Sequence, residues 1–220
     1  MLCNVASIDR VCYLSPMPPV YTEIIFDLET KKIFDDITTN DPADLGISVI
    51  SLYKRQLDQN LNEISGKINS FFEEDFAQMW ALFSNVDRIV GFNSLHFDVP
   101  AIAPLSPYDF KKLNHFDLMD HIKNALGFRL SLNAIAVETL GHTKIDNGLN
   151  AVSYWQEHSP ESLAKLKKYC EMDVIITKEV YDYGLKNKQL KYKDKWNTSR
   201  LIEVDFSYPS KVSEPQMELF

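Results

Sequence analysis

The sequence contains little cysteine and no long hydrophobic run. Its three cysteines, Cys3, Cys12 and Cys170, form no CxxC pair, which argues against both a disulfide framework and a zinc cluster. We therefore expect a reducing, cytoplasmic environment. No apolar run approaches the roughly 18 residues that a membrane span needs. Asp9 and Arg10 interrupt the one N-terminal stretch that could pass for a signal peptide, so we expect an unexported protein with no membrane partner.

Positive charge is also scarce. The 220 residues include 23 Lys and Arg against 31 Asp and Glu, which gives a formal net charge of −8. Such a surface repels polyanions at long range, so any nucleic acid has to be bound locally. The hydrophobic content of 45% in a chain of this length suits one well-packed domain better than two. We find no internal repeat and no low-complexity tract.

The order of the predicted elements favours an α/β fold. Apolar runs separated by short polar turns predict three antiparallel strands, at 21–28, 31–37 and 46–53. The later periodicity predicts helices at 75–83, 99–105, 118–126, 132–140 and 160–183, a buried strand at 88–92, and a hairpin of strands 189–193 and 201–206. This order fits a three-layer fold with a mixed central sheet and helices on both faces.

The predicted domain occupies residues 21–206, including the basic hairpin at about 186–206. Residues 1–20 end in a proline-rich stretch and are predicted to form a weakly ordered extension. Residues 207–220 are predicted to form a flexible tail.

The stretch 24–30 is an apolar strand that ends in two carboxylates. Because strand side chains alternate between faces, Asp27 and Glu29 point to the same side, opposite the apolar residues between them. Two like charges on one side repel each other, and a divalent cation such as magnesium or manganese offsets that repulsion. An exposed strand end with two solvated acids explains this segment equally well.

Further acids occur at two other places. Asp98 follows a predicted buried strand in the stretch GFNSLHFD, where it is either a site residue or a helix N-cap. Tyr169 and Asp173 are one turn apart on the longest predicted helix, on a side that its apolar neighbours turn toward the protein. Asp117 is interpreted as a helix cap or a supporting acid rather than a metal ligand. The five histidines have no metal-ligand spacing.

Together these motifs resemble those of the DEDDy group of 3′ to 5′ exonucleases in the ribonuclease H-like superfamily. FDLET at 26–30 matches the first motif, 93–98 the second, and Tyr169 with Asp173 the third. The second motif is more similar to the proofreading domain of family B DNA polymerases than to ribonuclease D. A related subgroup has histidine five residues before the last aspartate, where this chain has Lys168. The resemblance covers residues 21–183.

The resemblance implies a ribonuclease H-like fold and a site for two divalent ions, Mg²⁺ or Mn²⁺. In such a site Asp27 would bind both ions, and Glu29 and Asp173 would complete the first position. Asp98 would hold the second ion, and Tyr169 would orient the attacking water. The implied activity is removal of nucleotides from a single-stranded or frayed 3′ end of DNA, in repair or replication. The alternatives are RNA 3′-end trimming and a catalytically weak module that binds nucleic acid or a clamp.

Candidate nucleic-acid contacts lie in two regions. Near the implied site they are Thr30, Asn93 and Phe97. Asn93 and Phe97 either contact the 3′-terminal nucleotide or brace the site, and simple packing is the favoured role for Phe97. The second region, 184–200, has six cations and one acid. Its candidates for phosphate contact and base stacking are Lys191, Lys193, Lys195 and Trp196. The same lysines are equally consistent with a solvated, protected sheet edge.

The last five residues, 216–220, resemble the short peptide by which bacterial replication and repair proteins dock on the DNA sliding clamp. Leu219 and Phe220 would supply a hydrophobic anchor, with Gln216 at the start of the motif. The alternative is that Leu219 and Phe220 fold back onto their own domain.

Overall fold

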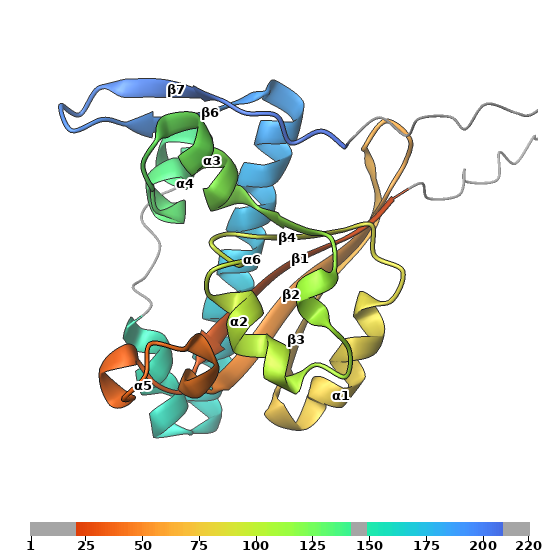
Figure 1. Cartoon of the computed structure of the whole chain (residues 1–220), viewed down its shortest axis with the longest axis vertical. Coiled ribbons are helices and arrows are strands. Elements are labelled where there is room, and N and C mark those ends of the chain that lie inside the picture. Colours follow the sequence, from red (N-terminus) through yellow and green to blue (C-terminus); the bar gives the residue numbers. More distant parts are fainter. Residues whose placement is uncertain (1–20, 142–148, 209–220) are drawn as a thin grey trace, which may run out of the picture.

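A five-stranded mixed sheet forms the centre of the domain (Figure 1). The computed structural model describes residues 21–141 and 149–208. Strand β1 (Tyr21–Thr30) pairs antiparallel with β2 (Ile47–Leu57), and β2 pairs antiparallel with β3 (Glu63–Phe72). On its other edge β1 runs parallel to β4 (Arg88–Gly91), which runs parallel to β5 (His115–Asp117). The order β3-β2-β1-β4-β5 confirms the predicted mixed sheet with three antiparallel strands at its start.

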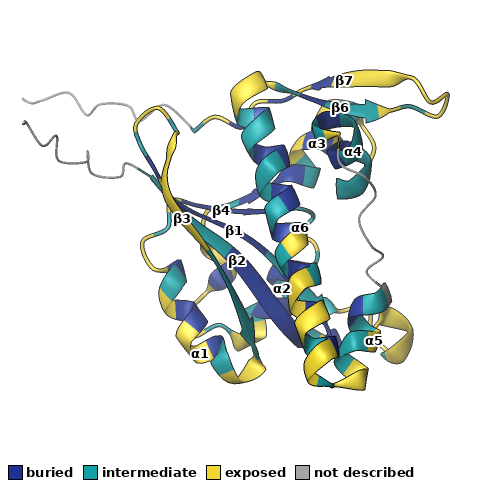
Figure 2. Cartoon of the chain, turned by 180° about the vertical axis from the view of Figure 1, so that it is seen from behind, coloured by how far each residue is buried: buried dark blue, intermediate teal, exposed yellow. Residues whose placement is uncertain are grey.

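The prediction of a strand at 31–37 is wrong. This segment is a short, exposed 3-10 turn (Phe34–Asp36), closed by a 3.0 Å hydrogen bond from the backbone N–H of Ile33 to the side chain of Asp36. The third strand is instead β3. Its sequence is polar and therefore predicts a connection, not a strand. β3 is a sheet edge whose first half is exposed, so its residues do not carry the apolar signal of a buried strand (Figure 2).

Helices cover both faces of the sheet, as predicted. The alternation along β1 sets the two layers, since Ile24, Phe26 and Leu28 pack against one group of helices and Ile25 against the other. The first group contains α1 (Phe76–Met79) and α2 (Asp98–Ile102). The second contains α3 (Leu118–Leu126), α4 (Leu132–Leu140) and α6 (Pro160–Asn187), which crosses in front of the sheet in Figure 2.

The remaining elements complete the outer parts of the domain. Helix α5 (Leu149–Glu157), which the sequence analysis did not predict, lies against α6 and β1. Strands β6 (Gln189–Lys193) and β7 (Ser199–Glu203) form the predicted hairpin, packed against α4 and α6. Short 3-10 helices occur at Pro42–Leu45, Glu73–Asp75, Trp80–Phe83, Ala103–Leu105 and Phe110–Lys112. Among the described residues, no helix is long and apolar enough to cross a membrane.

The helix ends follow the sequence except at the end of α6. Gly127 and Gly141 adopt left-handed φ angles of 82° and 75° after α3 and α4, as predicted. Helix α6 begins at the expected Ser159 cap but continues past the predicted end at Tyr183, to Asn187. Gly184 does not stop the helix. A methyl group there would overlap the ring of Phe206, so the glycine allows the chain after β7 to pack closely against α6.

The chain after β7 is tied to the start of β1. Arg88 donates hydrogen bonds of 2.7 Å and 3.1 Å to the carbonyl oxygens of Phe206 and Ser207. Tyr208 stacks on Tyr21 with ring centroids 4.1 Å apart. Residues 207 and 208, assigned from sequence to the tail, are therefore part of the domain. The rest of that tail and the predicted extension 1–20 lie outside the described residues.

Candidate active site

Asp27 and Glu29 lie on the face of β1 that α6 covers. Asp173, near the middle of α6, approaches them so closely that one carboxylate oxygen from each residue lies within 4.8 Å of the others. Cys170, one turn before Asp173, is fully buried beneath this group, with its sulfur 3.4 Å from the carbonyl oxygen of Asp27. The alternation predicted for β1 and the inward face predicted for α6 thus meet at one group of acids.

Asp98 approaches this group at the edge of β1 that β4 leaves unpaired. β4 pairs with β1 only at residues 23–25, so the following part of that edge is free to accept another element. Helix α2 begins there, and its first residue, Asp98, is 4% exposed. Its carboxylate accepts hydrogen bonds from the backbone N–H groups of Leu28 and of Asp98 itself. Asp98 therefore binds to the backbone of β1 between the two acids of that strand.

The four carboxyl groups have raised pKa values, chiefly because they are buried. Burial followed by repulsion from Asp173 and Asp98 raises the pKa of Glu29 to about 9. Burial raises the pKa of Asp98 to about 7 and that of Asp173 to about 6. The pKa of Asp27 also lies well above its ordinary value, because of burial and then repulsion from all three of the other acids. Asp27 is thus the electrostatic centre of the cluster.

The acidic cluster has no ion-pair partner in the part of the chain that the structure describes. None of its four members lies within 4.0 Å of a lysine or arginine nitrogen there. Lys31, close in sequence, is instead paired with Glu73 at 2.6 Å. Buried charges in proteins are normally paired or bound to a metal ion, so the cluster as it stands is incomplete.

Tyr169 is placed to donate a hydrogen bond within the cluster. Its hydroxyl bonds to Asp173, one turn further along α6. Burial, followed by the charges of Asp173, Glu29 and Asp27, raises the pKa of this phenol above its ordinary value of 10.0. Tyr169 therefore remains protonated near neutral pH and acts as a hydrogen-bond donor, not as a base.

Asp117 holds the loop that carries the second motif. Its carboxylate caps α3 by accepting a 2.9 Å hydrogen bond from Met119, and it also accepts bonds of 2.8 Å and 2.9 Å from the backbone N–H groups of Asn93 and Leu95. The prediction of a helix cap is confirmed. The bonds from Asp117 to the loop are not predictable from sequence alone. They form because β4 and β5 lie side by side.

The three candidate contacts near the acids differ in their surroundings. The hydroxyl of Thr30 donates to the carbonyl oxygen of Lys32 at 2.8 Å, which stabilises the turn after β1. The side-chain oxygen of Asn93 is buried without a hydrogen-bond partner among the described residues. Phe97 packs against the core and lies edge-on to Phe34, with ring centroids 6.1 Å apart. Phe34 is 43% exposed. The sequence predicts a strand at this position, so Phe34 is not among the predicted site residues.

The comparison with protein families identifies this architecture. A family model of the RNase H superfamily matches residues 24–184, which span β1 to α6 and include all four acids and Tyr169. The chain belongs to the RNase H superfamily. Members of this superfamily are usually nucleases that hydrolyse phosphodiester bonds, and they typically use divalent metal ions.

A solved structure shows the same fold. The chain is similar to the family B DNA polymerase from the hyperthermophilic archaeon Pyrobaculum calidifontis, with a TM-score of 0.54 and 18% sequence identity. The match covers 76% of this chain and 25% of the polymerase chain, so the matched part of this chain corresponds to about a quarter of the length of that chain. No curated protein sequence matches the chain.

The residues of this RNase H-like site fit divalent cations. Carboxylate oxygens are the ligands that hard ions such as Mg²⁺ and Mn²⁺ prefer. Asp27, Glu29 and Asp173 converge closely enough to share one ion. Asp98 lies outside that group of three, and its charge raises the pKa of both Asp27 and Glu29.

The predicted basic hairpin is only partly free to meet nucleic acid. Lys193 is paired with Glu138 of α4 at 3.0 Å, and Arg200 is paired with Asp194 at 2.7 Å. The backbone of Lys191 bonds to the hydroxyl of Thr139. The count of lysines in the sequence therefore overstates the charge that the folded hairpin presents. Residues 216–220, with the candidate clamp contacts Gln216, Leu219 and Phe220, lie outside the described residues.

Proposed function

We propose that the protein is a metal-dependent 3′ to 5′ exonuclease that removes nucleotides from DNA ends. The observation that supports this most is the group of four carboxylates, one buried and three half-buried, without a cationic partner in the described chain, on an RNase H-like fold. The arrangement Asp27, Glu29, Asp98, Tyr169 and Asp173 agrees with the tyrosine-containing DEDD motifs. A role in DNA repair or replication follows from the same proposal.

The proposed cofactors are two divalent ions, Mg²⁺ or Mn²⁺. Asp27 would bind both, because all three of the other acids raise its pKa. Glu29 and Asp173 would hold the first ion with it, and Asp98 the second. When bound, such a pair lowers the pKa of a water and neutralises the charge on the leaving 3′ oxygen.

The protein's own contribution is to orient the reactants. Tyr169 would orient the attacking water by accepting a hydrogen bond from it at the phenol oxygen, because its one proton is donated to Asp173 and its raised pKa keeps that proton in place. Asp173 accepts from Tyr169 and so fixes the direction of the phenol. Asp117 would keep Asp98 in register by holding the preceding loop at Asn93 and Leu95.

The proposed substrate is a single-stranded or frayed 3′ end of DNA. The proposed contacts for the terminal nucleotide are Thr30, Asn93, Phe97 and the exposed Phe34. Trimming of RNA remains the alternative activity, since no residue of the site is assigned to a 2′ hydroxyl. We also propose that residues 216–220 bind the DNA sliding clamp. Equal clamp binding by the whole chain and by a chain lacking these five residues would refute that part.

End-labelled oligonucleotides test the activity. Single-stranded DNA and RNA of one sequence, labelled at the 5′ end, would be incubated with Mg²⁺ or Mn²⁺. We expect a ladder that shortens one nucleotide at a time from the 3′ end of DNA. Asp27→Asn and Asp173→Asn should each lower the rate about 1,000-fold or more, because they remove charge that acts on the transition state. Asp109→Asn, an exposed acid outside the cluster, is the matched control. Internal cuts, or no hydrolysis of either polymer, would contradict the proposal.

A further inference from the structure

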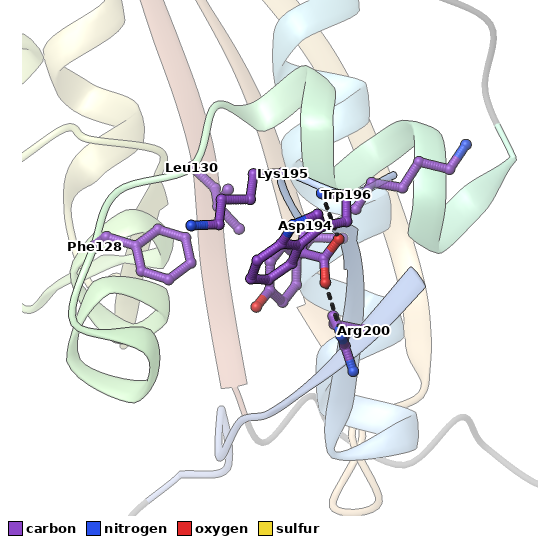
Figure 3. A pocket seen from close by; sticks show the side chains of 8 residues that line it. Phe128, Leu130, Asp194, Lys195, Trp196 and Arg200 are labelled. Carbon is purple, nitrogen blue, oxygen red and sulfur yellow. Dashed lines mark hydrogen bonds and ion pairs between the residues drawn. The ribbon is translucent and has the colours of Figure 1, made fainter. Parts of the chain in front are cut away.

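An aromatic pocket lies between the tip of the β6–β7 hairpin and the loop that joins α3 to α4. It has a volume of about 510 Å³. Phe128 and Leu130 come from the loop, and the hairpin contributes Tyr192, Lys193, Asp194, Lys195, Trp196 and Arg200. Figure 3 shows the ring of Phe128 facing Lys195 and Trp196 across this space. None of these residues belongs to the acidic cluster.

The aromatic walls of the pocket are unusually exposed for side chains of their size. Trp196 is 71% exposed and Phe128 is 47% exposed. Phe128 also lies edge-on to Tyr192, with ring centroids 6.0 Å apart, so the floor of the pocket is aromatic as well. Flat apolar faces that remain in water within one concave site are suited to stacking a planar ligand.

The hairpin holds these rings in place. The hydroxyl of Thr139 bonds to both the N–H and the carbonyl oxygen of Lys191, at 2.9 Å and 3.1 Å, and so joins β6 to α4. At the tip, the carboxylate of Asp194 accepts bonds from the backbone N–H groups of Trp196 and Thr198. The turn that presents Trp196 is therefore ordered before any ligand arrives, which limits the entropy lost on binding.

The charge around the pocket favours an anionic, planar ligand. Three cations and one acid line it. Arg200 is paired with Asp194, and Lys193 with Glu138, whereas Lys195 forms no ion pair with any described residue. The amino group of Lys195 lies 4.4 Å from the centre of the Trp196 ring. A group stacked on this indole would therefore have an available ammonium beside it. A base attached to a phosphate has both features.

Helix α6 separates the start of the hairpin from the acids. Asp173 and the last residue of the helix, Asn187, are separated by roughly 21 Å along the axis, because each residue advances the helix by about 1.5 Å. A strand with the spacing of B-DNA, about 3.4 Å per nucleotide, needs about six nucleotides to cover that distance. The carboxyl end of β1 and the hairpin tip lie toward the same side of the molecule in Figure 1.

We propose that this pocket binds a base of single-stranded nucleic acid, several nucleotides from the 3′ end that the acids hydrolyse. Trp196 and Phe128 stack on the base, and Lys195 contacts the neighbouring phosphate. The distance from the 3′ end rests on the proposed exonuclease function, whereas binding of a base does not. The pocket thus gives an acidic protein a local hold on a long strand and leaves very short products free to dissociate.

Binding without metal tests the pocket separately from catalysis. A fluorescein-labelled dT 16-mer would be titrated in EDTA and followed by anisotropy. We expect Trp196→Ala to raise the Kd about tenfold, as loss of one base stack does. Trp196→Phe, which keeps an aromatic face, should restore most of the affinity. Leu201→Ala is the matched control, because Leu201 is 59% exposed on the same hairpin and does not line the pocket. A U 16-mer serves as the RNA arm, and a loss with either polymer supports the proposal.

A 16-mer that lacks bases separates stacking from charge. Its Kd should be the same for wild type and Trp196→Ala. An equal loss with this strand, or no difference between Trp196→Ala and Leu201→Ala on the strands with bases, would overturn base binding. If Trp196→Ala and Leu201→Ala do not differ, the pocket would bind another kind of partner, such as a peptide.

Length dependence tests the position of the pocket. With Mg²⁺, Trp196→Ala should raise the KM for the dT 16-mer about tenfold and leave the KM for a dT trinucleotide unchanged, because three nucleotides cannot reach the hairpin. Equal increases for both lengths would refute the proposed distance. If wild type hydrolyses neither strand but loses affinity for the 16-mer on Trp196→Ala, the exonuclease proposal fails and the base pocket stands. If wild type hydrolyses the strands and Trp196→Ala changes neither the Kd nor the KM, the base pocket fails and the exonuclease proposal stands.

Discussion

The hydroxyl of Tyr169 donates a hydrogen bond to Asp173, and the two residues occupy successive turns of α6. The bond stabilises the ionised form of Asp173 and holds the phenol beside Asp27 and Glu29. Since burial and the nearby acids raise the pKa of the phenol, Tyr169 acts through its proton. That assignment can be separated experimentally from a role as a base.

Replacing Tyr169 by Phe should lower kcat about 100-fold with little change in KM, because the hydroxyl proposed to orient the attacking water is lost. The pH dependence of kcat/KM should keep its shape between pH 7 and 10, since the tyrosine does not titrate in that range. Tyr183→Phe, a half-buried tyrosine further along α6, is the control and should keep full activity. If Tyr169→Phe instead removes a limb of the pH profile, Tyr169 is a base.

The metal-free protein should become less stable as the pH rises. A carboxyl group with a raised pKa binds more protons in the folded than in the unfolded chain, so its contribution to the free energy of unfolding is present at low pH and decreases as the pH rises. For Glu29 the window extends from its ordinary value of 4.5 to about 9. In EDTA the Tm should fall between pH 5.5 and pH 8.5. Added Mg²⁺ should raise the Tm most at pH 8.5, and an equal effect of Mg²⁺ at both pH values would contradict this.

Asp27→Asn should stabilise the metal-free protein while it abolishes activity. It removes the charge that is repelled by three neighbouring acids and keeps the shape of the side chain. At pH 8 in EDTA we expect the Tm to rise by about 3 °C, the shift that ~1 kcal/mol produces in a chain of this size. Calorimetry should then show no further gain with Mg²⁺. A lower Tm than wild type would mean that the ionised form of Asp27 is stabilised by the fold.

Asp98→Asn should remove one of two metal ions. The other three acids lie together without it, so one ion can still bind among them. Titration with Mn²⁺, followed calorimetrically, should give two ions per chain for wild type and one for Asp98→Asn. Asp44→Asn, an exposed acid on a separate 3-10 helix, should still bind two. A single ion bound by wild type would refute the two-ion proposal.

Asp117→Ala should reduce both stability and turnover. The change leaves the backbone N–H groups of Asn93, Leu95 and Met119 without their acceptor, at a cost of about 1–3 kcal/mol. Release of the loop should also shift Asp98 and lower kcat. Asn124→Ala is a control on the same helix, because Asn124 is exposed and lies near the end of α3 opposite to Asp117. A stability loss with unchanged kcat would limit Asp117 to its capping role.

Local rules accounted for much of the fold and for the direction in which each acid points, whereas the joint site was implied only by the family resemblance. Strand alternation placed Asp27 and Glu29 on one face, and helical spacing placed Tyr169 beside Asp173. Such rules work where each residue's direction is fixed by its own element. They also located the caps at Asp117 and Ser159 and the glycines after α3 and α4.

The errors arose where a distant contact decides the structure. The edge strand β3 is stabilised by pairing with β2 and needs no apolar pattern of its own. Glycine is needed at position 184 because the ring of Phe206, 22 residues later in the chain, packs against it and leaves no space for a side chain. The charge of the hairpin depends on Glu138 in α4, which pairs with Lys193. Neighbouring sequence contains none of this information.

The stacking of Tyr208 on Tyr21 brings the two ends of the domain together. Arg88 lies over the Tyr208 ring at 3.8 Å, and Tyr208 donates a 2.7 Å hydrogen bond to the buried Glu23, so this junction is firmly held. Figure 1 shows it on the side away from the hairpin tip. Topologically the domain is almost a closed ring of chain. A short linker could join residues 21 and 208, and new ends could be opened in the exposed turn at 58–62 without cutting the acidic site or the aromatic pocket.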